Sequence, residues 1–410
     1  MTHSFNAMNM AKKQIADLDA QLLRRQLRVT DSACDIKTMV KGRQLTAFCS
    51  NDYLGFANHS ALISALAQGA QLYGAGSGAS HLISGHSIAH ELLEKKLALF
   101  QSSHIPKARA LFFSTGYLAN LTAITGLVRL APVGGASIYS AKLNHASLID
   151  GVRLASAQDK ASVSLFDHHK LDSLRAELQK DLRPLKLIVT DGVFSMDGDL
   201  APVQTLLQIA EEFDALLLID DAHGFGVLGK QGHGILEQEN LSSDRIIYVG
   251  TLGKAAGISG AFICGQESLI EWLIQKGRPY IYSTATPPAI AHALLKSIEM
   301  IDGPEGQERR AKLAELINIW QQEMIFSQWE KIPSCTPIQP VILGSNANAL
   351  LAASLLDKAG YWIPAIRPPT VAAGSARLRI TFSANHSVDD VRQLIRTLKT
   401  IEQEALASTS

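Results

Sequence analysis

Cysteine and charge are both scarce in this chain of 410 residues. The four cysteines, Cys34, Cys49, Cys264 and Cys335, are far apart and form no CxxC pair, so the sequence indicates neither a disulfide framework nor a zinc site. Charged residues make up 19% and the formal net charge is +0, which argues against nucleic acid or an anionic membrane as a partner. We therefore expect no metal, and partners that are small molecules or copies of the chain itself.

Long apolar runs are also missing. No run approaches the roughly twenty residues that a membrane-spanning helix needs. The first residues, MTHSFNAMNMAKK, lack the apolar core of a secretion signal. The expected location is the cytoplasm, whose reducing conditions suit widely spaced free cysteines.

The most informative stretch that is present reads IIYVGTLGKAAG, from Ile246 to Gly257. β-Branched and aromatic residues at its start predict a buried strand, and small residues then form a turn around a single lysine, Lys254. Small neighbours leave room for a planar ligand, and an amine there can lose its proton and form a Schiff base with an aldehyde. Most lysines are solvated surface charges, so the assignment of Lys254 as the nucleophile depends on the residues upstream.

An acid and a histidine lie at the end of the preceding predicted strand. Residues 215–220, ALLLID, form a nearly continuous apolar run that ends in Asp220 and is followed by His223. Such a run predicts a central parallel strand, and α/β sheets place their chemistry just past the carboxyl ends of these strands. A carboxylate buried there needs a cation or a protonated nitrogen as its partner. A pyridinium nitrogen is such a partner.

The motifs DDAHG, at Asp220 to Gly224, and TLGKAAG, at Thr251 to Gly257, resemble those of the α-oxoamine synthases. These are fold-type I pyridoxal phosphate enzymes that condense an amino acid with an acyl thioester and release carbon dioxide. The resemblance runs from about Leu22 to the C-terminal helix. It implies that Lys254 holds the aldehyde of pyridoxal 5'-phosphate and that Asp220 keeps the ring nitrogen protonated.

A second segment is suited to the phosphate of that cofactor. The predicted strand Ala110 to Phe113 runs into STGYLAN, where a helix begins. Unpaired amides of Gly116 and Tyr117 at the helix start favour a dianion, as does the helix dipole. The hydroxyl of Thr251 can bind the same group.

Three further cofactor contacts are implied by the resemblance. His145, which follows the predicted strand Ser137 to Ser140, matches the family's histidine that stacks on the cofactor ring and acts in catalysis. Ser195 could bind the phenolic oxygen of the cofactor. His223 matches the cofactor-binding histidine of the DDAHG motif.

The resemblance also implies substrate contacts. In the family the second arginine of RLRIT, Arg379 in this chain, binds the carboxylate of the amino acid. An arginine of the N-terminal arm meets the acyl substrate; Arg24 aligns best and Arg25 is the near competitor. Thr370, in IRPPTV, would line the acyl or amino acid site.

The chain alternates predicted strands and helices in its middle, which is typical of a mostly parallel sheet covered by helices on both faces. With the resemblance, this gives an α/β, fold-type I pyridoxal phosphate transferase. We expect an N-terminal helical arm at residues 1–50, a large cofactor domain at residues 51–290, and a small α+β domain at residues 291–410. Related enzymes are homodimers, so a homodimer is expected.

IRPPTV, SNDYLG and STATPP favour the members that use L-alanine and a pimeloyl thioester, carried on CoA or on an acyl carrier protein. The alternative is a glycine C-acetyltransferase (2-amino-3-ketobutyrate ligase) or another α-oxoamine synthase, because TDGVFSMDG and LNHASLIDGVRL fit that enzyme equally well. A non-catalytic partner subunit and an aminotransferase are the remaining alternatives. Retention of Lys254, Asp220, His145 and His223 together argues against the non-catalytic subunit.

The position of the reactive amine can be tested chemically. Borohydride reduces a carbon–nitrogen double bond, so treating the native enzyme should fix the cofactor on the peptide that contains Lys254. Peptide mapping by mass spectrometry locates the label. A label on another peptide, or none, would contradict the assignment.

Overall fold

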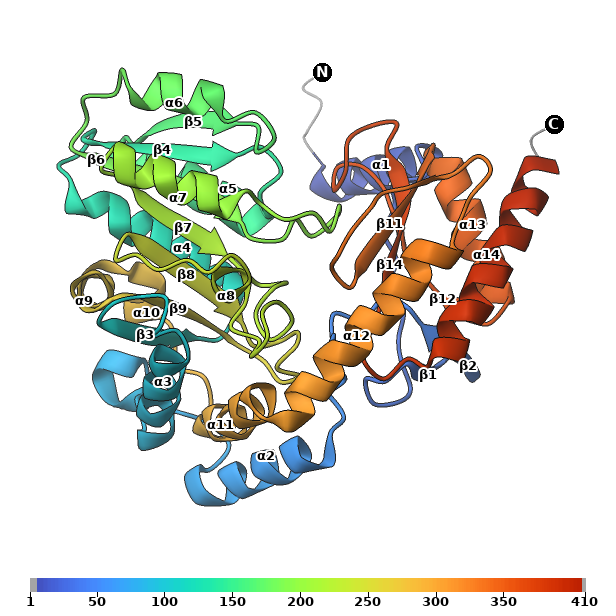
Figure 1. The fold of residues 1–410 in the computed structure, drawn as a ribbon, viewed down its shortest axis with the longest axis horizontal. Coiled ribbons are helices and arrows are strands. Elements are labelled where there is room, and N and C mark those ends of the chain that lie inside the picture. The colour runs from blue at the N-terminus through green and yellow to red at the C-terminus, as the bar shows by residue number, and fades with distance from the viewer. Residues whose placement is uncertain (1–5, 408–410) are drawn as a thin grey trace. The chain divides into compact units, whose positions relative to one another are not determined.

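The computed structural model describes residues 6–407, which form two compact units. The large unit is Asn51–Ala314. The small unit joins the described parts of Met1–Ser50 and Glu315–Ser410. The sequence places a boundary at residue 290, but this position falls inside α11 (Pro288–Asp302), which packs against α2 (Ser60–Tyr73) and α3 (Ile88–Phe100) of the large unit. In Figure 1 the large unit runs from blue through green to gold.

The large unit is built on a sheet of seven strands in the order β3-β9-β8-β7-β6-β4-β5. Neighbouring strands from β8 to β5 are parallel, whereas β9 is antiparallel to both β3 and β8. This confirms the predicted mostly parallel sheet, including a short strand that returns beside the lysine strand. The strands are β3 (Ala108–Phe113), β4 (Ala136–Ala141), β5 (Ser162–Phe166), β6 (Leu185–Asp191), β7 (Leu216–Asp220), β8 (Ile246–Thr251) and β9 (Ala261–Gln266).

The central strands are apolar throughout because both faces of the sheet are covered. Side chains alternate between the two faces along a strand. In β8, Ile247 and Val249 join one hydrophobic core with Leu187 of β6 and Leu218 of β7. Their neighbours on the strand are also fully buried, so the opposite face is covered as well. A run without polar alternation is the pattern that this burial requires.

Helices of the large unit connect and cover these strands. Helix α4 packs against α5, α9 and α10, and against β8 and β9 of the sheet, while α7 packs against β7. Helix α4 begins at Gly116, as the sequence predicts. Besides α2, α3 and α11, the helices of this unit are η1 (His81–Gly85), α4 (Gly116–Leu127), η2 (Val128–Leu130), α5 (Ala146–Asp159), α6 (Asp172–Leu178), α7 (Val203–Glu212), α8 (Ile235–Gln238), α9 (Glu267–Lys276) and α10 (Arg278–Tyr282). Helix α12 (Pro304–Glu323) begins in this unit and ends in the small unit.

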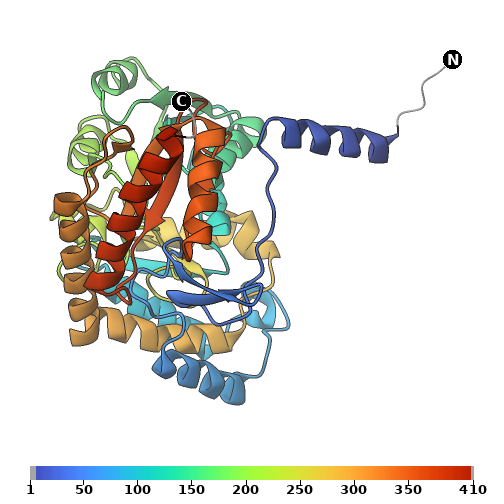
Figure 2. The ribbon, with the colours of Figure 1, turned by 90° about the vertical axis from the view of Figure 1, so that its right-hand side faces the viewer.

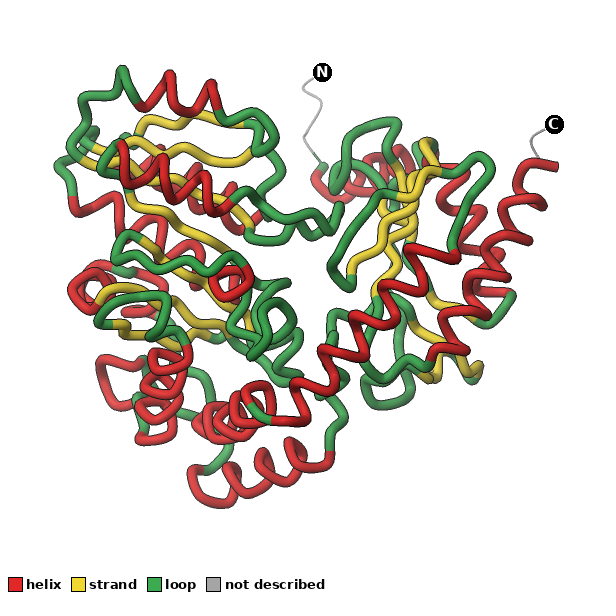
Figure 3. Tube along the Cα trace, in the orientation of Figure 1, coloured by secondary structure: helices red, strands yellow, loops and turns green. Residues whose placement is uncertain are grey.

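The small unit contains two small sheets, drawn in yellow among its helices in Figure 3. One has the antiparallel order β10-β11-β14-β13, and the other has the order β1-β2-β12. Strand β2, from the N-terminal segment, pairs in parallel with β12 of the C-terminal segment. The elements are β1 (Lys37–Val40), β2 (Arg43–Ala47), β10 (Glu330–Lys331), β11 (Ile338–Gly344), α13 (Asn346–Lys358), β12 (Tyr361–Trp362), β13 (Ala365–Ile366), β14 (Ala376–Thr381) and α14 (Val388–Ala407).

The N-terminal segment forms a shorter helix than its sequence predicts. Apolar residues at roughly helical spacing from Met10 to Arg28 predict an amphipathic arm over that range. Helix α1 spans Ala7–Ala20 and has no buried residue. It projects from the other elements of its unit, as Figure 2 shows. Leu22 adopts φ 58°, a left-handed conformation that ends a helix, so Arg24 and Arg25 lie in irregular chain. The predicted helix is wrong beyond residue 20.

No helix within residues 6–407 combines the length and the apolar character that crossing a bilayer requires.

The turn that carries the lysine depends on Gly257, which has φ 72°. A Cβ atom at this position would lie 2.6 Å from the backbone carbon of Phe56. Gly257→Ala should therefore lower the free energy of unfolding by about 2 kcal/mol or more, through the left-handed backbone and the overlap together. Urea unfolding measures the change.

Gly134→Ala is the matched control. Gly134 has φ 80°, but its Cβ would meet nothing within 4 Å. This variant isolates the backbone term and should cost about 1 kcal/mol. Equal losses in the two variants would show that the contact with Phe56 does not matter.

Candidate active site

Lys254 lies in the turn after β8, and its amine is held by a histidine. Nζ of Lys254 is 2.9 Å from Nε2 of His223. Nδ1 of His223 is in turn 2.5 Å from the hydroxyl of Tyr53, which is fully buried. The backbone carbonyl of Lys254 accepts a hydrogen bond from the amide of Gly257, which closes the turn. The amine is thus directed into a cavity by groups from three separate segments of the large unit.

Asp220 ends β7 and is only 5% exposed. One carboxylate oxygen accepts a hydrogen bond from the backbone amide of Ala222 at 3.0 Å, and the other accepts from Nδ2 of Asn120 at 2.6 Å. The carboxylate therefore has a fixed orientation before any ligand binds. Asn120 comes from the second turn of α4, so this helix supports the acid as well as beginning at the cavity.

His145 is the N-cap of α5, and both its backbone and its side chain are held by hydrogen bonds. Its backbone amide donates to Oδ2 of Asp191 at 2.7 Å, and its Nδ1 lies 2.7 Å from the hydroxyl of Ser147. Burial lowers the pKa of His145, and Lys254 adds to this effect, while Asp220 opposes it. Burial, together with Asp220, raises the pKa of Asp191 well above its ordinary value. The site thus contains a neutral imidazole beside two neighbouring buried carboxyl groups.

The start of α4 also lines the cavity. Thr115 caps the helix by accepting from the amide of Leu118. A Cβ at Gly116 would lie 2.9 Å from Oγ1 of Thr251, so only glycine leaves this approach open. Tyr117 is 42% exposed and donates its hydroxyl to Asp150. Backbone amides and the Thr251 hydroxyl therefore surround one small space.

One cavity of about 190 Å³ collects these groups. It brings together all the cofactor-site residues predicted from the sequence, and Asn120, Ser147, Asp191 and Ala222 join them in its lining. The predicted residues that line it are Gly116, Tyr117, His145, Ser195, Asp220, His223, Thr251 and Lys254.

Comparison with known proteins identifies the family. The sequence profile described as aminotransferase class I and II matches residues 43–398. The 8-amino-7-oxononanoate synthase of Janthinobacterium sp. (strain Marseille) is 52% identical over 393 residues, covering 96% of this chain and 98% of the relative. The chain belongs to the 8-amino-7-oxononanoate synthase family.

Solved structures agree with this membership. Serine palmitoyltransferase from Sphingomonas wittichii is 27% identical and has a TM-score of 0.88, covering 98% of this chain and all of that one. The 8-amino-7-oxononanoate synthase from Francisella tularensis is 29% identical with a TM-score of 0.72, covering 89% of this chain and 99% of that one. The predicted fold-type I architecture is thereby confirmed.

Pyridoxal 5'-phosphate is the cofactor of this family, and the cavity has the chemistry to bind it. Lys254 could offer an amine to the aldehyde, and Asp220 could offer a fixed carboxylate to the ring nitrogen. The start of α4 with Thr251 offers amides and a hydroxyl to the phosphate. His145 and His223 line the same cavity. The donor set therefore fits each functional group of the cofactor.

Of the predicted substrate residues, His145 lies in the large unit, and Arg24, Thr370 and Arg379 belong to the small unit. Arg379 is 6% exposed on β14, and its Nη1 donates to Oγ1 of Thr381 at 3.1 Å. The hydroxyl of Thr370 accepts from Nη2 of Arg25 at 3.3 Å, so the chain itself places Arg25 at this threonine.

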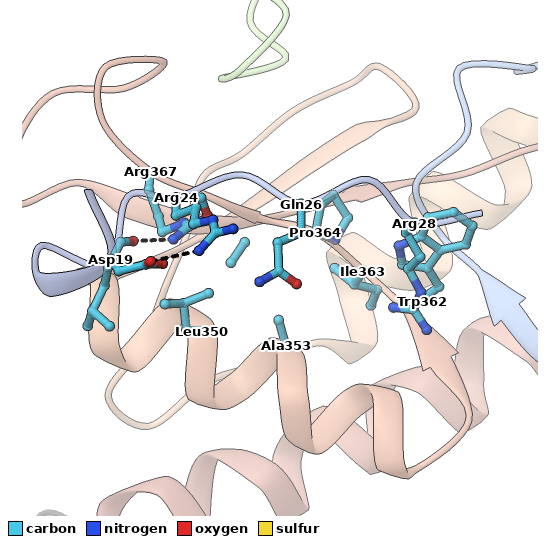
Figure 4. Close-up of a pocket in the computed structure, with 12 residues that line it drawn as sticks. Asp19, Arg24, Gln26, Arg28, Leu350, Ala353, Trp362, Ile363, Pro364 and Arg367 are labelled. Carbon is cyan, nitrogen blue, oxygen red and sulfur yellow. Dashed lines mark hydrogen bonds and ion pairs between the residues drawn. The ribbon is translucent and has the colours of Figure 1, made fainter. Parts of the chain in front are cut away.

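Arg24 lines a different feature of the small unit, a pocket of about 460 Å³ that Figure 4 shows. Arg24 pairs with Asp19 at 2.7 Å, and Arg28 and Arg367 line the same pocket. Leu350 and Ile363 contribute an apolar part to its wall. The pocket can hold a chain with an apolar body and an anionic end.

Four residues that line the cofactor cavity were missed by reasoning from the sequence: Asn120, Ser147, Asp191 and Ala222. Tyr53 was missed as well; it does not line the cavity but contacts His223, which is far away in sequence. Asn120 contacts the equally distant Asp220, whereas Ser147 contacts its near neighbour His145. Asn120 gave a usable signal. It comes four residues after Gly116, so it lies on the same face of α4 as the helix start.

Asp221, the neighbour of Asp220, is completely buried but does not line the cavity. Its Oδ2 accepts from the Tyr248 hydroxyl at 2.9 Å and from the amide of Ile235 at 2.7 Å. Burial raises the pKa of Asp221 from 3.8 to about 7. Between these values the folded state holds a proton that the unfolded state has lost, so stability falls as pH rises.

Asp221→Asn should remove this pH dependence. Wild type should lose up to about 4 kcal/mol of unfolding free energy between about pH 4 and pH 7 relative to the variant. Urea unfolding at several pH values measures the two slopes. Asp214→Asn is the control, because Asp214 has an 84% exposed side chain and a left-handed backbone that asparagine tolerates. Parallel curves for wild type and Asp221→Asn would contradict the prediction.

Proposed function

We propose that this chain condenses L-alanine with a pimeloyl thioester, with loss of carbon dioxide, to form 8-amino-7-oxononanoate for biotin synthesis. The observation that carries the chemistry is the single cavity that collects Lys254, Asp220, His145 and His223. The choice of substrates is supported by relatives of that name at about half identity over nearly their whole length. Relatives of that name do not favour the glycine-using alternative.

When bound, pyridoxal 5'-phosphate supplies an aldehyde for the amino group and an electron-withdrawing ring that stabilises negative charge on the neighbouring carbon. Asp220 keeps a proton on the ring nitrogen, since its carboxylate is buried and already oriented by Asn120 and Ala222. Lys254 provides the base that removes the proton from Cα of alanine, and His223 holds its amine in place.

Apart from proton transfers, the reaction forms one carbon–carbon bond and breaks one carbon–sulfur and one carbon–carbon bond. Cα of alanine loses its proton to Lys254 and bonds to the carbonyl carbon of the thioester, whose carbon–sulfur bond breaks to release a thiolate, which takes a proton from solvent to become the free thiol. The bond from Cα to the alanine carboxylate then breaks, and carbon dioxide leaves. Lys254 returns a proton to Cα. His145 stabilises negative charge on the acyl oxygen during these steps.

The small unit supplies the substrate contacts in this proposal. Arg379 pairs with the alanine carboxylate, which suits a buried guanidinium with a planar fork of donors. Arg24 or Arg25 meets the acyl substrate, and Thr370 lines that part of the site. The pocket around Arg24 supports this, because it combines arginines with apolar side chains. CoA or an acyl carrier protein brings the acyl group.

We also infer a homodimer in the cytoplasm. Several large apolar side chains on α2, η1 and α3 are exposed, which favours a protein interface on this side of the large unit. They include Leu72 at 61%, Ile83 at 80%, Ile88 at 57% and Leu99 at 67% exposure.

A substrate panel tests the reaction. Glycine and L-alanine are each combined with acetyl-CoA, succinyl-CoA and pimeloyl-CoA, and release of free thiol and of carbon dioxide is measured. Alanine with pimeloyl-CoA should be the best pair, and glycine should be slower by about 10-fold or more, because one methyl group contributes about 1–3 kcal/mol to discrimination.

Lys254→Ala should release no thiol with any pair, which controls for uncatalysed hydrolysis. Preference for glycine with acetyl-CoA would overturn the proposal in favour of a glycine C-acetyltransferase. Formation of pyruvate from alanine without thiol release would indicate an aminotransferase.

A further inference from the structure

A chain of hydrogen bonds connects Asp220 to His145 inside the large unit. Nδ2 of Asn120 lies 2.6 Å from Oδ2 of Asp220 and 2.9 Å from Oγ of Ser147. Oγ of Ser147 lies 2.7 Å from Nδ1 of His145. Asn120 and Ser147 are each 1% exposed, so water does not compete for these bonds. Asn120 and Ser147 thus join two residues that act in the proposed reaction.

The directions of these bonds follow from counting hydrogens. A carboxylate only accepts, so the Asn120 atom that faces Asp220 must be the nitrogen. That nitrogen has two hydrogens, one for Asp220 and one for the Ser147 oxygen. Ser147 therefore accepts from Asn120 and retains its own hydrogen to donate to Nδ1 of His145.

An independent contact fixes the same direction. The backbone amide of Ser147 donates to Nδ1 of His145 at 3.2 Å. An amide cannot donate to a nitrogen that carries a hydrogen, so Nδ1 must have its lone pair free. Burial lowers the pKa of His145, which keeps the ring neutral. A neutral ring with a bare Nδ1 has its hydrogen on Nε2.

We propose that Asn120 and Ser147 are positioning residues that hold His145 as the neutral tautomer with its hydrogen on Nε2. The tautomer itself does not depend on the proposed function; only the role of the Nε2 hydrogen in the reaction rests on it. Nε2–H can donate to an acyl oxygen as negative charge develops there. Asp191, Asp220 and Lys254 are titratable groups around His145. A neutral donor adds no positive charge beside Lys254.

Nitrogen NMR of holoenzyme labelled in its histidines tests the tautomer, because a bare ring nitrogen and a protonated one have well separated shifts. The His145 signals are assigned by their loss in His145→Gln. Wild type should show a bare Nδ1 and a protonated Nε2 near neutral pH. An Nδ1–H tautomer or a charged ring would overturn the proposal, whatever the variants do.

Ser147→Ala removes one of the two donors to Nδ1 and should give a mixture of tautomers, with turnover lower by about tenfold. Ser147→Thr retains a hydroxyl and should recover the wild-type spectrum. Ser156→Ala is the matched control, since Ser156 lies on the same helix but does not line the cavity. Wild-type tautomer and turnover in Ser147→Ala would overturn the proposal.

The NMR experiment tests the tautomer of His145, and the substrate panel tests the proposed function, so either claim can be refuted without the other. A bare Nδ1 in an enzyme that prefers other substrates would refute only the proposed function. An Nδ1–H tautomer in an enzyme that condenses alanine with pimeloyl-CoA would refute only the role of Asn120 and Ser147.

Discussion

The site is constrained by the burial of two carboxyl groups side by side. Asp191 and Asp220 end neighbouring parallel strands in direct register, and both are nearly inaccessible to water. Two ionised carboxylates in such surroundings repel each other and lose hydration. The surroundings supply compensation through the amide of His145, the side chain of Asn120 and the amide of Ala222. These three groups are therefore placed where the two carboxyl groups need hydrogen bonds.

The same requirement explains why the two acids can have different tasks. Burial raises the pKa of Asp191, which favours its protonated form. Asp220 lines the same cavity and receives hydrogen bonds at both of its oxygens, from Asn120 and from Ala222. One acid is thus suited to bind a cation, while the other orients the backbone of His145. Parallel strands make this possible because their ends meet at one edge.

Much of the large unit could be predicted from the sequence because its signals are local. Apolar runs predicted the central strands, and residues at their ends predicted Asp220, His223 and Lys254. Tyr53 could not be predicted as a neighbour of the site, because its contact with His223 joins residues far apart in sequence. Asn120 had only its spacing from Gly116 as a signal, and its contact with Asp220 exists only in the folded chain. The contact of Ser147 depends on the orientation of the His145 ring, which the sequence does not give. The predicted helical arm was wrong past Ala20, since a left-handed leucine gives no pattern in the sequence.

The small unit is assembled from both ends of the chain, with β2 paired to β12 across more than three hundred residues of sequence. On the ribosome, the strands β1 and β2 are synthesised first but their partner emerges almost last. The large unit between them has all its strands available much earlier and can form its sheet first. The hairpin of β1 and β2 therefore keeps an unpaired strand edge until β12 has been synthesised. The small unit folds later than the large unit and is exposed to aggregation for longer.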